Sequence, residues 1–184
     1  MISALVRTPF WFLRHGQTDW NAKDLSQGNI DIPLNATGIA QAHVAAAKLV
    51  GRGIASIVSS PLSRAHDTAK IVGAALGLEV SLIPDLHEVS FGVQEGQEMG
   101  DWFHDWVDGV FTPVGGESFA ELCTRSVAAV NQALESTAPV LIVAHGALFR
   151  ALRAEMGLRP DVRTQNCVPI FCTPNRPSWD LQEA

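Results

Sequence analysis

The residues best placed for chemistry are a basic pair, Arg14 and His15, at the end of a short apolar run. The run Thr8-Pro9-Phe10-Trp11-Phe12 leads into Leu13-Arg14-His15-Gly16-Gln17-Thr18. The apolar residues predict a buried strand over 10–13, and Gly16 predicts a turn directly after it. This order places a fixed cation beside a nucleophilic imidazole at the carboxyl end of a strand, where open α/β sheets bind ligands. A lone histidine at a strand end is more often structural, so the interpretation of His15 as a nucleophile depends on the other segments.

A second cation, Arg64, lies in the segment Ser59-Ser60-Pro61-Leu62-Ser63-Arg64-Ala65. A strand is expected over 54–59 and a helix after Pro61, so Arg64 also starts from the carboxyl edge of a sheet. The guanidinium fork matches the oxygens of a phosphoryl group in a bidentate way that an ammonium cannot. The alternative is an exposed helical arginine in a surface ion pair.

A second histidine, His145, follows the continuous apolar run Val140–Ala144 and precedes Gly146. Such a run is typical of a strand buried on both faces. His145 could donate to an anion, and Gly146 would let the backbone approach that anion at a helix N-terminus, where partial positive charge favours it. Basic residues at the ends of two separate strands are difficult to explain by core packing alone.

These segments resemble the signatures of the histidine phosphatase superfamily, which includes the cofactor-dependent phosphoglycerate mutases. Arg14-His15-Gly16 matches R-H-G, residues 60–65 match S-P-L-x-R-A, and His145-Gly146 matches the late H-G pair. Leu86 to Gly96 resembles L-x-E-x-x-x-G-x-x-E-G, in which the first glutamate, here Glu88, is the proton donor to the leaving oxygen. The resemblance runs from Phe12 to about Asn166. Solvated loop acids are the alternative for Glu88 and Glu95.

The resemblance also implies contacts with substrate outside these signatures. Thr18 and Asn21 match the family's R-H-G-x-T-x-x-N and would contact the phosphate, and Gln27-Gly28 matches its glycine before D-x-P-L, where the backbone can approach substrate. Gly116-Glu117-Ser118 matches the family's G-E-S before a helix. We interpret this segment mainly as a helix cap and only secondarily as part of the functional site. Asp67 stands where the family usually has glutamine.

The resemblance implies a metal-independent, acid-type histidine phosphatase without a cofactor. It would hydrolyse a small-molecule phosphomonoester through a phosphohistidine on His15, with Arg14, Arg64 and His145 binding the phosphoryl group and Glu88 as the acid. The alternatives are phosphoryl transfer of the phosphoglycerate mutase type and, with less support, a non-catalytic phosphate-binding domain. The substrate alcohol, the pathway and the oligomeric state stay open.

The segment 84–117 is expected to be an irregular lid or insert region, because it is rich in glycine, aspartate and aromatic residues. Between Glu88 and Ser118 there is no lysine or arginine, whereas the family's mutases carry basic residues in a longer insertion there. We therefore expect a phosphatase, since a polyanionic sugar acid would meet like charge. Residues 98–108 form either a lid over the site or a short helix packed on the core.

Composition limits the remaining classes. The 184 residues are 47% hydrophobic and 17% charged, with a net charge of −6, which argues against a nucleic-acid partner. The three cysteines have neither metal-ligand nor disulfide spacing, and no histidine pair has metal spacing, so reduced thiols in the cytoplasm and no metal are expected. The apolar part of residues 1–7 is too short for a secretory signal, and no stretch is long enough to span a membrane.

The expected elements alternate between strands and helices. This order and the resemblance predict one domain over 1–184, a three-layer phosphoglycerate mutase-like α/β fold whose central sheet is mostly parallel, with helices on both faces. Thr37 is expected to cap a helix to about Val50 that buries Ile39, His43, Ala46, Ala47 and Val50. Ser118 and Glu121 predict a capping box. A last strand is expected over 167–173, at an edge or bulged because of Pro169.

Overall fold

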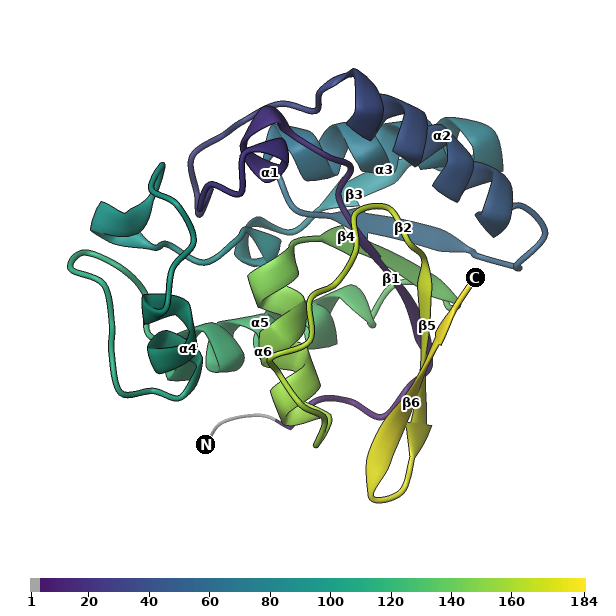
Figure 1. Cartoon of the computed structure of the whole chain (residues 1–184). Helices are drawn as coiled ribbons and strands as arrows, with labels where there is room; N and C mark the ends of the chain where they lie inside the picture. Colours follow the sequence, from purple (N-terminus) through teal and green to yellow (C-terminus); the bar gives the residue numbers. More distant parts are fainter. Residues whose placement is uncertain (1–3) are drawn as a thin grey trace.

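A six-stranded sheet forms the middle layer of the protein (Figure 1). The computed structural model describes residues 4–184; residues 1–3, part of the stretch expected to be too short for a secretory signal, lie outside it. The strand order is β3-β2-β4-β1-β5-β6. β1 to β4 are parallel, and β5 and β6 each run antiparallel to their inner neighbour. The strands are β1 Phe10–Arg14, β2 Ser56–Ser59, β3 Val80–Leu82, β4 Val140–Ala144, β5 Ile170–Asn175 and β6 Ser178–Glu183.

The register of the three central strands brings their carboxyl ends to one level. Arg14 pairs with Ala144, and Ser59 pairs with Val143. The amide of His15 then donates to the carbonyl oxygen of Ala144 at 3.0 Å, which extends the ladder by one residue. His15, Ser60 and His145 therefore leave the sheet at the same edge, although they are far apart in the sequence.

Helices cover both faces of the sheet, which confirms the three-layer prediction (Figure 1). Successive side chains of β1 point to opposite faces: Phe10 and Phe12 pack with α5 and α6, and Trp11 and Leu13 pack with α2 and α3. Because β1 and β4 are buried on both faces, they read as unbroken apolar runs. The four helices are α2 Ala36–Leu49, α3 Ser63–Leu76, α5 Phe119–Ala133 and α6 Gly146–Glu155.

The predicted start of α2 was wrong, and of the residues predicted on its inner face only Ala46 is buried. Asn35, not Thr37, caps the helix, and its side chain accepts a hydrogen bond from the amide of Gly38. Ile39 and Val50 are 45% and 57% exposed, whereas the buried face consists of Gly38, Ala42, Ala45, Ala46 and Leu49. Small residues let α2 lie close to its neighbour α3, so the close-packed stripe is made of alanines instead of the larger apolar residues.

The expected last strand also needs correction. β5 lies between β1 and β6, and β6 is the edge strand that the sequence did not suggest. Pro169 precedes β5, so its missing N–H interrupts no ladder bond. Trp179 is the one buried residue of β6, and Leu181 is partly buried against the same core, so the strand has too few apolar positions for a strong sequence pattern.

The segment expected to be irregular contains three short helices, η1 Pro84–Leu86, η2 Gly92–Gln94 and α4 Trp102–Val107. It forms the teal lobe on the left of Figure 1. α4 packs on the rest of the molecule through Phe103 and Trp106, which join a buried cluster with Leu122 of α5 and Ala151 of α6. The capping box of Ser118 and Glu121 at the start of α5 is confirmed. Within residues 4–184, no helix is long and apolar enough to cross a membrane.

Candidate active site

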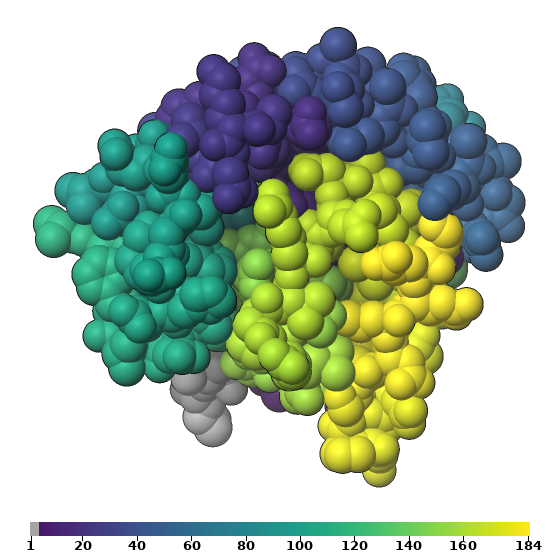
Figure 2. Space-filling view, in the orientation of Figure 1, coloured from purple at the N-terminus to yellow at the C-terminus, as the bar shows by residue number. Residues whose placement is uncertain are grey.

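The carboxyl edge of the sheet opens into a cavity of about 390 Å³. The surface is hollowed where the purple N-terminal, teal and yellow-green segments meet in Figure 2. Four of the five proposed catalytic residues line the cavity: Arg14, His15, Arg64 and Glu88. The fifth, His145, is fully buried beside them, with its ring centroid 5.3 Å from that of His15.

His15 is held as a neutral imidazole with a defined tautomer. Its Nδ1 lies 2.7 Å from the carbonyl oxygen of Gly16, and since a carbonyl can only accept, Nδ1 carries the proton and Nε2 carries the lone pair. The side chain is only 2% exposed. Burial, followed by the positive charges of Arg64 and Arg14, lowers the pKa of His15 well below its usual value. A free lone pair on Nε2 is what a nucleophilic histidine requires.

Both arginines are anchored to backbone carbonyls, and in each the buried Nε has no partner among residues 4–184. Arg14 Nη1 donates to the carbonyl oxygen of Thr164 at 2.7 Å. Arg64 donates to the carbonyl oxygens of Gly28 at 2.7 Å and Ile30 at 2.9 Å. The Nε atoms of both arginines are buried without a partner within residues 4–184. Burial lowers the pKa of Arg14 to about 10, so both guanidinium groups stay charged at neutral pH.

His145 hydrogen-bonds to a residue that the sequence analysis missed, Ser60. Its Nε2 lies 2.7 Å from Ser60 Oγ, and its Nδ1 is buried without a partner in the part of the chain that the structure describes. Burial, then the charge of Arg64, lowers the pKa of His145 well below its usual value. Ser60 stands inside the segment quoted around Arg64, but nothing local indicates that it lies beside the end of β4.

Gly146 brings the backbone close to Arg14. A Cβ atom at this position would lie 3.2 Å from Nε of Arg14, so a side chain would press on the unpaired nitrogen. Gly146 is also the first residue of α6, which places the start of that helix at the cavity.

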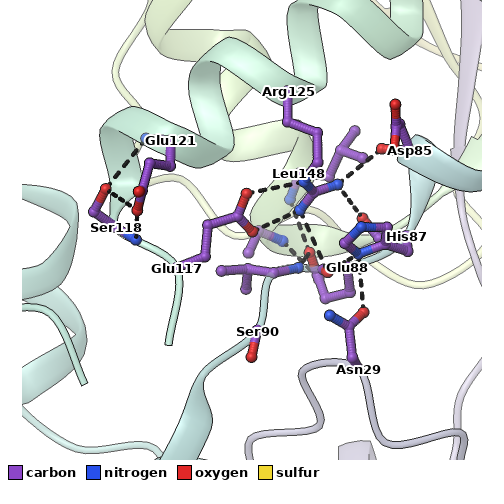
Figure 3. A network of polar contacts seen from close by, with 12 residues as sticks. Asn29, Asp85, His87, Glu88, Ser90, Glu117, Ser118, Glu121, Arg125 and Leu148 are labelled. Atoms are coloured by element: carbon purple, nitrogen blue, oxygen red, sulfur yellow. Dashed lines mark hydrogen bonds and ion pairs between the residues drawn. The ribbon is translucent and has the colours of Figure 1, made fainter. Parts of the chain in front are cut away.

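Glu88 is fixed by the start of α6 (Figure 3). Its carboxylate oxygens accept the amides of Ala147 and Leu148, each at 3.0 Å, and also that of Val89 at 3.0 Å. Glu88 is 8% exposed and lines the cavity, so the alternative of a solvated loop acid does not apply to it. The other acid of its segment, Glu95, accepts from the amides of Asn29 and Phe91 and supports the loop around Gly28.

Four of the five residues expected to contact substrate line the cavity: Asn21, Gln27, Gly28 and Gly146. Thr18 does not, because it is fully buried and caps the short helix α1, Asp19–Ala22. Its hydroxyl accepts the amide of Asn21 at 3.1 Å and donates to Gln27 Oε1 at 2.8 Å. Thr18 therefore orients two cavity residues without facing the cavity itself.

The outer part of the cavity carries basic residues that the sequence analysis missed. Arg150 of α6 and Arg163 of the following segment line it, together with Asp24 and Asp161. Arg150 lies over the ring of Phe103 at 5.0 Å and donates to the carbonyl oxygen of Pro160 at 2.9 Å. The segment 88–118 contains no lysine or arginine, but Arg150 and Arg163 from later in the chain line the same cavity. An acidic substrate would therefore meet positive charge there as well as the acidic residues of this segment.

The segment 98–108 combines the two roles that the sequence left open. Trp106 is fully buried against α5 and α6, so α4 is a core-packed helix. Its Phe103 and His104, with Gly100 and Asp101 before it, line the cavity and form one wall. Within residues 4–184, no group of three or more histidine, cysteine, aspartate or glutamate side chains is arranged to hold a metal ion.

The fold and the cavity define an α/β protein with a cavity, lined by arginine and histidine, at the carboxyl edge of its sheet. The comparisons with known proteins agree with the resemblance. The model of the histidine phosphatase superfamily (branch 1) matches residues 10–166. The chain belongs to this superfamily.

Two sequence relatives and one solved structure illustrate its neighbourhood. It is 39% identical over 175 residues to the Yersinia enterocolitica protein named "Probable phosphoglycerate mutase GpmB", covering 85% of this chain and 80% of the relative. It is 37% identical over 165 residues to the Bacillus subtilis protein named "Uncharacterized phosphatase PhoE", covering 88% and 84%. A mycobacterial glucosyl-3-phosphoglycerate phosphatase, solved with VO3, superposes with a TM-score of 0.84 at 32% identity, covering 95% of this chain and 97% of that one. These relatives support a phosphatase.

Proposed function

We propose that the protein hydrolyses a small-molecule phosphomonoester through a phosphohistidine on His15. The observation that carries this proposal is the set of buried, unpaired nitrogens beside the neutral His15: Nε of Arg14, Nε of Arg64 and Nδ1 of His145. Buried polar groups are rarely left without a partner, so three of them together point to an anion as the missing partner. A phosphoryl group has the charge and the oxygens to occupy them.

In the first step, the lone pair on Nε2 of His15 attacks phosphorus and the ester P–O bond breaks. Glu88 donates its proton to the leaving oxygen, which departs as the alcohol. Arg14, Arg64 and His145 bind the phosphoryl oxygens, where charge is spread during the transfer. The amides of Ala147 and Leu148 then hold the carboxylate of Glu88 that remains.

In the second step, a water molecule attacks phosphorus and the P–N bond to His15 breaks. The carboxylate of Glu88 accepts the proton of that water, which restores the acid, and inorganic phosphate leaves. The sum is ester plus water giving alcohol plus phosphate. Two fixed guanidinium groups supply positive charge of the kind that a metal ion supplies in other phosphatases, so the proposal includes no metal.

Trapping the intermediate tests this proposal. Rapid quench with a ³²P-labelled ester should yield a phosphoenzyme that is labile in acid and stable in base, and His15→Ala should yield none. The matched control is His43→Ala, because His43 is an exposed histidine of α2. An equal amount of adduct on His15→Ala would refute the assignment.

A second candidate function is phosphoryl transfer of the phosphoglycerate mutase type. Arg150 and Arg163 at the outer cavity favour it, because they could bind a carboxylate or a second phosphate. Turnover of 3-phosphoglycerate with 2,3-bisphosphoglycerate should be compared with hydrolysis of aryl, nucleoside and sugar phosphates. We expect hydrolysis to be faster; mutase turnover above every hydrolysis tested would decide for the second candidate. Phosphate binding without turnover of any ester would indicate a non-catalytic domain.

A further inference from the structure

The guanidinium of Arg125 binds the side chain of Glu117 and a short stretch of chain beside the cavity, residues 85–88 (Figure 3). Arg125 lies on α5, and its Nε and Nη2 donate to the two carboxylate oxygens of Glu117 at 2.9 and 2.7 Å. Its Nη1 donates to the carbonyl oxygens of Asp85 at 2.8 Å and His87 at 2.9 Å, and Nη2 also reaches that of Glu88 at 3.4 Å. These bonds use all five N–H groups of the fork.

The stretch that Arg125 binds is the one that carries Glu88. Three backbone carbonyls of residues 85–88 are fastened to α5 through this single side chain. Glu117 adds a further tie, because its amide donates to the carbonyl oxygen of Ser90 at 2.8 Å. The Arg125 and Glu117 side chains are each 16% exposed, so solvent competes little with the pair. Arg125 does not line the cavity, and Glu117 balances its charge.

Glu88 is therefore held from two helices at once. Arg125 of α5 donates a hydrogen bond to the backbone carbonyl of Glu88, and the amides of Ala147 and Leu148 in the first turn of α6 donate to its carboxylate. α5 and α6 pack against each other, so the groups that bind the backbone and the carboxylate of Glu88 belong to one packed pair of helices. We infer that the orientation of the Glu88 side chain depends on both sets of hydrogen bonds. A proton donor must meet the leaving oxygen within hydrogen-bond reach, and a misplacement of about 1 Å can cost ~10²-fold in rate.

We propose that Arg125, with Glu117, is the positioning residue for the proton donor Glu88. This inference rests on the proposed function, in which Glu88 protonates the leaving group. It also gives Glu117 a role separate from helix capping. Of the three residues Gly116-Glu117-Ser118, Ser118 is the one that takes part in the capping box, with Glu121, whereas Glu117 pairs with Arg125. A residue that merely stabilised the fold would affect all substrates alike. A residue that positions the acid affects esters in proportion to how much their leaving group needs a proton.

The test compares an alkyl phosphate with p-nitrophenyl phosphate, whose leaving group needs little protonation. Arg125→Met keeps the aliphatic stem and removes all five donors. We expect kcat for the alkyl phosphate to fall by about 10–100-fold and kcat for p-nitrophenyl phosphate by less than about 3-fold. Arg125→Lys should restore part of the alkyl rate, because an ammonium can keep some of these bonds. Glu117→Gln should give a smaller loss with the same preference for the alkyl ester.

The matched control is Val130→Ala on the same helix. Val130 is fully buried in the core on the sheet side and has no polar group, so this variant lowers Tm and leaves the hydrogen bonds from Arg125 to residues 85–88 in place. Its ratio of alkyl to aryl turnover should equal that of the wild type. If Arg125→Met does not fold, Arg125→Lys and Glu117→Gln carry the same comparison.

A double-mutant cycle separates this inference from the proposed function. In a Glu88→Gln background, Arg125→Met should reduce alkyl turnover by less than about 2-fold further, because the acid that it positions is absent. Equal losses on both esters in the Arg125 variants, with Glu88→Gln still selective, would overturn the positioning role alone. If Glu88→Gln instead slowed both esters equally, that result alone would refute the role of Glu88 as proton donor, without any measurement on the Arg125 variants.

Discussion

Ser60 Oγ lies 2.7 Å from Nε2 of His145 and joins the ends of the neighbouring strands β2 and β4. The Ser60 hydroxyl also accepts the amide of Leu62 at 3.3 Å, so its proton is available for Nε2. A proton donated to Nε2 leaves the other proton of the ring on Nδ1, the buried nitrogen without a partner. The tautomer in which Ser60 donates to Nε2 is the one that leaves His145 with a proton on Nδ1, as the proposed binding of a phosphoryl group requires.

Ser60→Ala should lower kcat by about 10-fold on alkyl and aryl phosphates alike. Losing a buried hydrogen bond costs about 1–3 kcal/mol, and 1.4 kcal/mol corresponds to about tenfold. The loss should not depend on the leaving group, because His145 acts on the phosphoryl oxygens. Ser56→Ala at the start of β2, where the side chain bonds to the carbonyl of Thr137, is the control and should retain wild-type rates. Unchanged turnover in Ser60→Ala would exclude the tautomer argument.

The pH dependence of activity should reflect the lowered pKa of His15. Burial first, then Arg64 and Arg14, favours the neutral ring, so the nucleophilic form persists well below pH 6.5. Protonation of His15 should therefore cause no fall in kcat/KM between about pH 8 and pH 6.5. Arg64→Met removes one of the charges that lower this pKa, so its acid limb should move to higher pH. Substrate ionisation is the same for both proteins, so an acid limb that does not move would contradict the assignment.

Stability should decline in mild acid, because the pKa values of His15 and His145 are both lowered by burial. The unfolded chain then binds more protons than the folded chain below about pH 6.5, so the free energy of unfolding falls as pH falls. Above that pH the two histidines do not make the free energy of unfolding depend on pH. Below it, each contributes about 1 kcal/mol per pH unit until its folded pKa is reached. Urea unfolding from pH 8 to pH 5 measures this, and His145→Gln should show a smaller slope than the wild type.

Removal of divalent metal should leave activity unchanged, because Arg14 and Arg64 supply the fixed positive charge. Dialysis against EDTA, followed by assay with and without added Mg²⁺, Mn²⁺ or Zn²⁺, checks this expectation. Vanadate should inhibit competitively, since it can adopt the five-coordinate geometry of the transition state. Activity that disappears with EDTA and returns with one metal would show that the charge comes from elsewhere.

The sequence by itself determined the features that depend on neighbouring residues. Unbroken apolar runs predicted β1 and β4 because strands buried on both faces contain no polar positions. Ser118 and Glu121 predicted the start of α5 because a capping box forms between residues three apart. The basic residues after the strands predicted one shared site, since the carboxyl ends of parallel strands lie at one edge.

Local pattern failed where a signal was weak or ambiguous. α2 is so rich in alanine that its larger residues, such as Ile39 and Val50, suggested the wrong face. β6 is mostly polar on its exposed face, and its place outside β5 depends on pairing and not on composition. The role of Thr18 was misjudged because its hydroxyl serves the cap of α1.

Tertiary structure alone decided which distant residues meet. Ser60 reaches His145 across 85 positions, and Arg125 reaches residues 85–88 from about 40 positions away. Arg150 lies over the ring of Phe103 of α4, and Arg150 and Arg163 line the same cavity as that helix although they follow it by more than 40 positions. The physical reason is that side-chain hydrogen bonds and charge pairs act over a few ångströms, while the chain path that closes those distances is set by the packing of helices on both faces of the sheet.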